Sequence, residues 1–480
     1  MTLDDVYGDD LRLAKWMAEC KLQNESHKSI RRRHLLFSLL AASGSVMIPL
    51  QSVTAADNDV LVSNQKVNIE IQKPPRDDRD YETFMLANGL RVLLCSDPSS
   101  NEAAVAMDVH VGACSDPDLV PGLAHFNEHM LFLGTKEYPK EASFEAFLAA
   151  NGGTSNAFTD SEDTVYFFSM EAEAENRLVE ALARFGSFFS SPLFTESATG
   201  RELNAIESEN AKNLQSDIFR IFQIQKSRAN PKHPFSKFFT GNKITLLENT
   251  KAQNIDLRQE LISFYNRYYS ANQMTLAIVA PQSLTTLKKM VMNTFSAVPN
   301  HEVEKPEIAW SGIIAPFSDD SVIAGCGNIV EIVPVQDLRL LVLAFPVIYQ
   351  STQDRQDSLF TKQADYVSHL LGHEGPGSLL SYMKKQQWAN SLGSSTEAEL
   401  SDFETFSVTV ELTSQGLANV DRVTEAVFSY IQMLREERMP DYLFDEVLQL
   451  TELEWRFLTK GSPVNYVQSL VSAKRRGPAT

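Results

Sequence analysis

Hydrophobic and polar positions follow a regular order from about residue 80 onward, and this order predicts strands first and helices afterwards. Residues 81–97 form two alternating runs joined by Asn88-Gly89, a dipeptide typical of β-hairpins. Period-2 and period-3.6 segments then follow one another down to residue 295. After the hairpin, the pattern predicts a strand at 103–113, helices at 123–134 and 141–153, strands at 154–160 and 164–170, helices at 174–189, 199–217 and 255–270, a strand at 274–280 and a helix at 283–295.

The same order of elements begins again beyond a polar, proline-bearing stretch. This second part is predicted to hold strands at 328–335, 338–347 and 403–412 and helices at 357–373, 377–386, 420–437 and 441–458. Such a repeat indicates two homologous domains of α+β class, each a mostly antiparallel sheet with helices packed on one side. We expect one domain at 68–300, a linker at 301–320 and a second domain at 321–480. The second copy stops before a closing strand and helix, so we expect it to be incomplete.

The N-terminal 60 residues do not fit this pattern. Three arginines at 31–33 precede an uncharged run at 35–56 that ends in small residues, which is typical of a signal peptide or signal anchor. The acidic residues upstream are atypical of either. A cleaved targeting segment, one membrane anchor and a misplaced start codon all stay open, and residues 1–60 are left out of the fold prediction. Membrane association is expected only if 35–56 is an anchor; otherwise we expect a cytoplasmic protein.

Composition narrows the classes of function. The 480 residues carry a formal net charge of −19, which argues against a nucleic-acid-binding protein because those present a basic face. The four cysteines are far apart and form no C-x-x-C pair. A cysteine zinc knuckle and a disulfide-rich scaffold are therefore both disfavoured.

The helix predicted around "GLAHFNEHMLFLGT" (122–135) carries the most informative chemistry. His125, Glu128 and His129 fall on one stripe of this helix. Two imidazoles one turn apart can bind one zinc ion, and H-x-x-E-H is a signature of zinc peptidases. In such a site Glu128 accepts a proton from a zinc-bound water that attacks a peptide carbonyl. The alternative is a solvated polar face, but the apolar neighbours of these residues favour a buried helix whose polar groups need partners.

A third metal ligand must come from another segment. The predicted helix containing "GRELNAIESEN" offers Glu202, Glu207 and Glu209. Glu202 and Glu209 are seven residues apart and share a face, so one could bind zinc while the other orients a histidine. Spacing alone does not choose between them, and a solvated acidic face is the alternative.

A second pair of histidines, His369 and His373, occurs in "HLLGHEGPGS". Glu374 follows this pair instead of lying inside it, and glycines and a proline break the helix around His373. We therefore expect a loop with a special conformation that contacts a ligand, and no second metal site.

Together, "GLAHFNEHMLFLGTKEYPKE", "GGTSNAFTD", "LNAIESEN", "NPKHPFSKF" with "TGNKITL", and "HLLGHEGPGSLL" resemble the insulysin branch of the M16 zinc metallopeptidases. The resemblance runs from about residue 70 to the C-terminus. It implies the two α+β domains that form the N-terminal half of a clam-shaped peptidase, with one Zn²⁺ per chain.

The resemblance also implies roles for individual residues. His125, His129 and Glu209 would bind zinc, Glu128 would be the catalytic base, and Glu202 would orient a histidine. Substrate would contact an edge strand at Asn156, Ala157 and Phe158 and a pocket lined by Phe132 and Phe219. A distant site that anchors a peptide's N-terminus would comprise His369, Gly372, His373, Glu374, Gly375 and Leu392.

Two functions follow from this comparison. The first is a zinc metalloendopeptidase that acts on short, unfolded peptides. The second is a non-catalytic or partner-dependent peptide-binding half-chain, because family members of this branch run to about double this length. Expected partners are peptide substrates, together with a C-terminal-half partner or further copies of the chain.

Overall fold

The computed structural model describes residues 71–172, 175–317, 328–397, 400–437 and 441–476. The expectations for residues 1–60, including the 35–56 segment, lie outside these ranges. Contacts divide the described chain into two units: a larger one made of residues up to 331 together with 457–476, and a smaller one of residues 332–456. None of the described helices is both long and apolar enough to cross a membrane.

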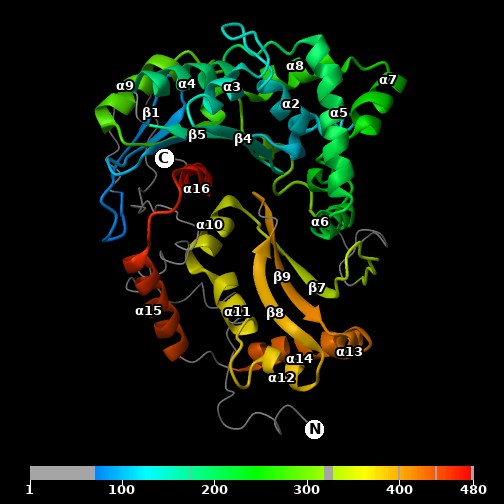
Figure 1. Ribbon diagram of the computed structural model, residues 1–480. Coiled ribbons are helices and arrows are strands. Elements are labelled where there is room, and N and C mark those ends of the chain that lie inside the picture. The colour runs from blue at the N-terminus through cyan, green and yellow to red at the C-terminus, as the bar shows by residue number, and fades with distance from the viewer. Residues whose placement is uncertain (1–70, 173–174, 318–327, 398–399, 438–440, 477–480) are drawn as a thin grey trace, which may run out of the picture. The chain divides into compact units, whose positions relative to one another are not determined.

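A six-stranded sheet forms the centre of the larger unit (Figure 1). Its strand order is β1-β2-β6-β3-β5-β4, and every neighbouring pair is antiparallel except β2 and β6. The expected mostly antiparallel α+β fold is therefore confirmed, including the hairpin between β1 and β2. The strands are β1 (Asp80–Met85), β2 (Arg91–Ser96), β3 (Glu102–Val109), β4 (Thr154–Thr159), β5 (Thr164–Glu171) and β6 (Met274–Ala280).

Helices cover one face of this sheet and enclose the main core (Figure 1). Aromatic rings dominate the packing there, with Phe126, Tyr166, Phe185 and Phe189 almost fully buried. Each such ring removes a large apolar area from water, which is the principal stabilising term in folding. The helices of this unit before α16 are α2 (Leu123–Leu131), α3 (Ser143–Ala149), α4 (Glu175–Phe188), α5 (Glu196–Asn213), α6 (Asp217–Ser227), α7 (Asn249–Ala252), α8 (Leu257–Tyr268) and α9 (Leu284–Phe295).

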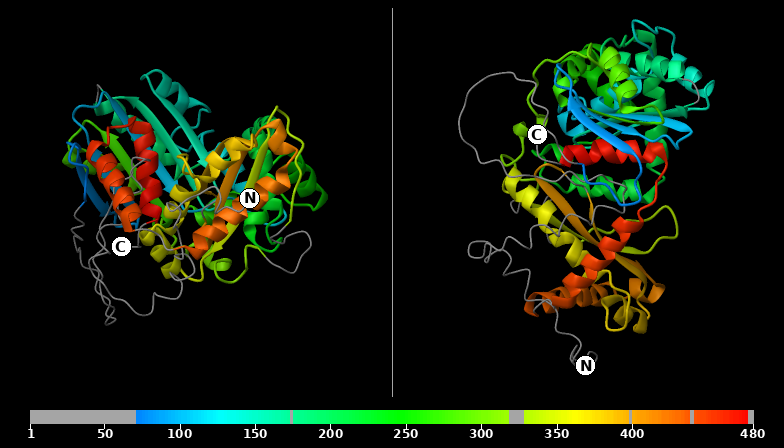
Figure 2. Two further views of the ribbon diagram at one scale, coloured as in Figure 1. Left: turned by 90° about the horizontal axis from the view of Figure 1, so that it is seen from below. Right: turned by 90° about the vertical axis from the view of Figure 1, so that its left-hand side faces the viewer.

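The opposite face of the sheet is covered by α16 (Pro463–Arg476), as Figure 2 shows. Strands β2, β3 and β6 are buried on both faces, so their outer side needs an apolar cover. Four residues of α16 provide it by packing on a second core cluster of strand residues: Tyr466, Val467, Leu470 and Val471. The predicted second domain at 321–480 includes this helix, whereas its contacts lie in the larger unit.

A buried ion pair ties α16 to the start of the sheet. Arg79 binds Asp77 through two hydrogen bonds of 2.7 Å, and its guanidinium lies 4.1 Å from the centre of the Tyr466 ring. The hydroxyls of Tyr81 and Tyr466 are 2.7 Å apart. Charge pairing, cation–π contact and hydrogen bonding therefore act at the same place.

The smaller unit contains a three-stranded antiparallel sheet with helices. The helix predicted at 357–373 is two helices in the structure, which meet at Lys362 with φ +55°. The strand predicted at 328–335 has no regular secondary structure, while a polar strand at 389–397 was not predicted. The elements are β7 (Leu340–Ile348), α10 (Thr352–Thr361), α11 (Gln363–Leu371), α12 (Leu379–Lys385), β8 (Ala389–Glu397), β9 (Phe403–Leu412), α13 (Ser414–Leu417), α14 (Val420–Glu436) and α15 (Asp441–Phe457).

Candidate metal centre

Helix α2 presents the H-x-x-E-H residues toward α5 and β4. It begins after Gly122, which has φ +93°, and the Asp116 carboxylate accepts the backbone N–H groups of Gly122 and Ala124 at 2.6 and 2.7 Å. These bonds satisfy donors that the first turn of a helix leaves unpaired. Asp116 was not among the predicted site residues, although an acidic residue shortly before a helix is a recognisable capping signal.

The structure brings His125, His129 and Glu209 together. The Nε2 atoms of both histidines lie 3.5 Å from the same carboxylate oxygen, Oε2 of Glu209. Among the described residues, these three form the group of histidine, cysteine and acidic side chains that could hold a metal ion. Their ligand atoms lie within 4.8 Å of one another.

Each histidine is oriented by a hydrogen bond at its other ring nitrogen. Nδ1 of His125 lies 2.7 Å from the carbonyl oxygen of Thr240. Because a carbonyl oxygen can only accept, Nδ1 is the donor in this hydrogen bond. Nδ1 of His129 lies 3.1 Å from Oε2 of Glu202. With the Nδ1 atoms engaged in this way, both Nε2 lone pairs face Glu209, as metal ligation requires. The role of Thr240 could not be read from its side chain, because a backbone carbonyl makes the contact.

The two distances between the histidine Nε2 atoms and the Glu209 carboxylate fit zinc. Tetrahedral sites with bonds of about 2.0–2.2 Å place neighbouring ligand atoms roughly 3.3 Å apart, close to the 3.5 Å separations found here. Glu207, the third candidate on α5, instead accepts the backbone N–H of Lys243 at 2.8 Å. The geometry therefore distinguishes the three glutamates, because Glu209 faces the Nε2 atoms of both histidines and Glu202 lies behind His129.

The charges at this site perturb one another. Burial raises the pKa of the Glu128 carboxyl, against the opposing effects of His125 and of a 2.6 Å hydrogen bond from Thr159. Burial lowers the pKa of His129, but hydrogen bonds to Glu202 and Glu209 outweigh it and raise that pKa to about 9. The hydrogen bond from His129 lowers the pKa of Glu209. Glu128 is thus a buried carboxyl with a raised pKa, which suits a proton acceptor.

Strand β4 lies at an edge of the sheet and passes beside Glu128, which receives the Thr159 hydrogen bond. Its exposure alternates, so that Asn156 and Phe158 are exposed while Ala157 packs against the core. The backbone N–H of Ala157 donates to the Asn156 side-chain oxygen at 2.9 Å and not to a neighbouring strand. A main-chain donor is therefore directed outward at the edge nearest the site.

The two phenylalanines expected to share a pocket lie in different settings. Phe132 packs against the core, with its ring centroid 5.3 Å from that of Phe188. Phe219 lies on α6 and is 43% exposed. Among the described residues no ring contact joins the two, so their common pocket stays a prediction.

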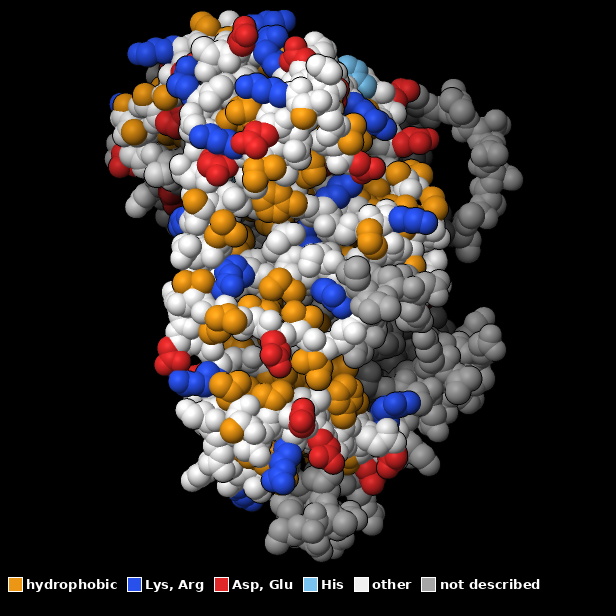
Figure 3. Space-filling view, turned by 90° about the vertical axis from the view of Figure 1, so that its right-hand side faces the viewer, with side chains coloured by type: hydrophobic (Ala, Val, Ile, Leu, Met, Phe, Trp, Pro, Cys, Tyr) orange, Lys and Arg blue, Asp and Glu red, His pale blue; other side chains and the backbone are white. Residues whose placement is uncertain are grey.

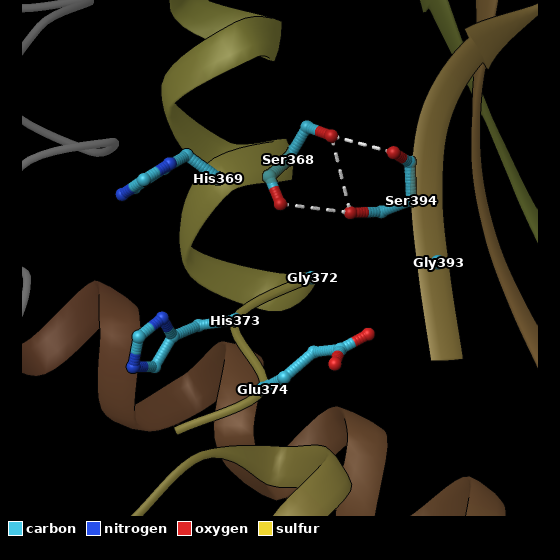
Figure 4. A pocket seen from close by; sticks show the side chains of 7 residues that line it. All are labelled: Ser368, His369, Gly372, His373, Glu374, Gly393 and Ser394. Atoms are coloured by element: carbon cyan, nitrogen blue, oxygen red, sulfur yellow. Dashed lines mark hydrogen bonds between the residues drawn. The ribbon is translucent and has the colours of Figure 1, made fainter. Parts of the chain in front are cut away.

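In the smaller unit, the second histidine pair lines a pocket between α11 and β8 (Figure 4). Hydrogen bonds between Ser368 and Ser394 tie the helix to the strand, with each residue accepting at its carbonyl oxygen. Leu392 does not line the pocket, because it is buried in the core of this unit. Four predicted residues line it together with three that were not predicted: His369, Gly372, His373 and Glu374, with Ser368, Gly393 and Ser394.

On the face drawn in Figure 3, acidic and basic side chains are interspersed. Its described basic side chains lie among acidic, apolar and uncharged ones, whereas a phosphate backbone is attracted by a continuous basic surface.

A helix bearing H-x-x-E-H, a glutamate from a second helix and an adjacent edge strand define the class of inverted zinc-peptidase sites on an α+β scaffold. Residues 91–232 match the description "Insulinase (Peptidase family M16)", and residues 256–450 match "Peptidase M16 inactive domain". The chain belongs to peptidase family M16.

Individual proteins similar to this chain support the family assignment. The insulin-degrading enzyme of Drosophila melanogaster is 43% identical over 408 residues, which are 85% of this chain and 40% of the relative. A Caenorhabditis elegans relative named as a zinc protease is 40% identical over 388 residues, or 81% of this chain and 44% of the relative. The crystal structure of pitrilysin matches with a TM-score of 0.73 and 29% identity, over 85% of this chain and 42% of that one. The chain spans about 40% of the length of the curated relatives it matches.

Proposed function

We propose that this chain is a zinc metalloendopeptidase that hydrolyses peptide bonds in short, unfolded peptides. The observation that carries the proposal is the convergence of two histidine Nε2 atoms on one Glu209 oxygen, with Glu128 beside them on the same helix. His125, His129 and Glu209 would hold one Zn²⁺ per chain. Zinc held there would act as a Lewis acid and would lower the pKa of water to about 7.

The protein's own residues account for the proton transfers. Glu128 is buried, so its carboxylate is a stronger base than one in water, and the Thr159 hydroxyl holds it in place. It would take a proton from the attacking water and deliver it to the leaving amine. Glu202 and the Thr240 carbonyl keep the histidine rings fixed throughout.

The edge strand β4 would hold the substrate. An extended peptide that adds beside β4 can accept the Ala157 N–H once the Asn156 side chain releases it. Binding of this kind uses main-chain groups, so it tolerates many sequences but requires an unfolded segment. Phe158 and Asn156 are exposed on the strand and would contact substrate side chains. Phe132 and Phe219 are proposed to line the neighbouring pocket.

The pocket of the smaller unit is proposed as a second peptide-binding site. In Figure 4, Glu374 extends toward β8, while His369 and His373 project to the other side. A carboxylate beside small residues such as Gly372 and Gly393 offers a counter-charge to a peptide's terminal amine. A Cβ atom at the neighbouring Gly375 would lie 2.6 Å from Nε2 of His373, so a side chain there would displace the His373 ring.

A second function is favoured by the length of the relatives. Because the chain spans about 40% of them, it could act as a peptide-binding half-chain whose catalysis depends on a C-terminal-half partner or on another copy. The metal site would then bind zinc without turnover by the chain alone.

The test is cleavage of a quenched fluorescent peptide by the purified, zinc-loaded chain, with Glu128→Gln as control. We expect about one zinc per chain in both proteins. The rate of peptide cleavage should be at least about 10³-fold lower in the variant than in the wild type. Zinc binding without cleavage in either protein would favour the partner-dependent half-chain. Normal cleavage by Glu128→Gln would rule out the proposed base.

A further inference from the structure

The loop at residues 240–243 contacts both helices that carry the proposed metal site, α2 and α5. It contacts α2 through Thr240 and Gly241, and it contacts α5 through Lys243. Both segments lie far from this loop in sequence, so these contacts arise only in the fold. Among the described residues, the group that could hold a metal includes no side chain of this loop. The loop can therefore affect the geometry of that group only through the two helices.

On the side of α2, the loop lies against the helix N-terminus. A Cβ atom on Gly122 would come within 2.3 Å of the Gly241 Cα, so two glycines make this approach possible. Gly241 itself has φ +73°. The close approach brings the carbonyl of Thr240 to 2.7 Å from Nδ1 of His125, where it fixes the ring.

On the side of α5, the loop is held by Glu207. Oε2 of Glu207 accepts the N–H of Lys243 at 2.8 Å. Glu207 lies two residues before Glu209, the proposed third metal ligand. The loop between these two anchors is itself fixed. Asn242 and Thr245 exchange backbone-to-side-chain hydrogen bonds of 3.1 and 2.9 Å.

We propose that residues 240–243 form a brace that sets the separation of α2 and α5, and that Glu207 is a positioning residue for the metal site. This inference rests on the proposed zinc site. His125 and Glu209 come from different helices, so their spacing depends on what holds those helices together. Hydrogen bonds behind metal ligands typically change metal affinity by about 10–100-fold when they are lost.

The test compares Glu207→Ala, Glu207→Gln and Glu248→Ala in the full chain. Glu248 is an exposed carboxylate just beyond the loop and serves as the matched control. Zinc affinity is measured by competition with a chelator, and the visible absorption of the Co²⁺-substituted protein reports ligand geometry. Thermal unfolding of the metal-free proteins shows whether each variant is folded.

We expect Glu207→Ala to weaken zinc binding about tenfold or more and to alter the cobalt spectrum. Glu207→Gln keeps an oxygen acceptor for Lys243 and should restore both, and Glu248→Ala should match the wild type. If Glu207→Ala leaves both the cobalt spectrum and the zinc affinity unchanged, the proposed brace is wrong although the zinc site stands. A lower melting temperature of Glu207→Ala without any spectral change would contradict the brace in the same way. Failure of the wild type to bind either metal would overturn both proposals.

Discussion

Both histidines of the candidate metal centre keep one ring nitrogen in a hydrogen bond and direct the other toward Glu209. For His129 the hydrogen-bond partner is Glu202, a half-buried carboxylate on α5. A carboxylate behind a metal-binding histidine fixes the tautomer and increases the basicity of the ligating nitrogen. The contribution proposed for Glu202 can therefore be tested separately from direct metal ligation.

Replacement of Glu202 by alanine is expected to lower zinc affinity by about 10–100-fold without removing a ligand. Chelator competition measures this change, and Glu196→Ala, which removes an exposed carboxylate from the first turn of the same helix, is the control. Equal affinities for the two variants would mean that His129 needs no orienting partner.

Another histidine, His110, lies between two carboxylates away from the candidate metal centre. Its Nδ1 is 2.8 Å from Asp163 and its Nε2 is 2.9 Å from Glu307, and all three side chains are largely buried. Burial lowers the pKa of His110, but the two carboxylates outweigh this effect and raise it to about 10. Glu307 belongs to the segment predicted as the linker, so His110 fastens this segment to the end of β3.

This ion-paired histidine gives stability a pH dependence of defined sign. Because the pKa of His110 is raised on folding, its contribution is fully present below about pH 6.5 and is lost as pH rises toward 10. Denaturant unfolding should show His110→Gln less stable by about 3 kcal/mol at pH 6, with a smaller deficit at pH 9.5. His301→Gln, at an exposed histidine, should show no such trend. A deficit that stays constant across this range would contradict the assigned pKa.

Among the elements, β4 is suited to a specific test of substrate binding. Ala157→Pro removes the outward N–H of the edge strand, and proline is tolerated at sheet edges. We expect KM for an unstructured peptide to rise about tenfold or more, with zinc affinity unchanged. Asn156→Ala frees the same N–H but removes a side chain that is proposed to contact substrate, so its KM should rise less than that of Ala157→Pro. A higher KM for Asn156→Ala than for Ala157→Pro would argue against strand addition.

Elements with a strong local pattern could be predicted, and those that depend on distant partners could not. The α2 helix and its histidines follow from 3.6-residue spacing, and β5 and β6 follow from runs of apolar residues. Strand β8 has a polar sequence and is ordered by pairing with β9, while 328–335 has the alternation of a strand but no regular structure. The same limit applies to the site, since spacing alone did not choose between Glu202 and Glu209, and the fold gives each carboxylate a different contact.

At the scale of the whole molecule, α16 completes the larger unit from the far end of the chain. Tyr466→Ala would remove a buried ring from Arg79 and Tyr81, and we expect it to lower the free energy of unfolding by about 3 kcal/mol. Denaturant titration measures the change. Asn465→Ala, at the exposed neighbouring position, should lie within about 0.5 kcal/mol of the wild type. Similar losses in both variants would mean that the helix contributes as a whole and not through the aromatic contact.

The position of α16 also has a consequence for synthesis on the ribosome. The six strands of the larger sheet are complete by Ala280, yet the helix that covers their second face is made only after all of residues 332–456. During that interval an apolar sheet surface is exposed to water in the nascent chain, a state prone to aggregation. We therefore expect folding of the larger unit to finish late in translation, and chaperones that bind exposed apolar surface to engage the growing chain until α16 emerges.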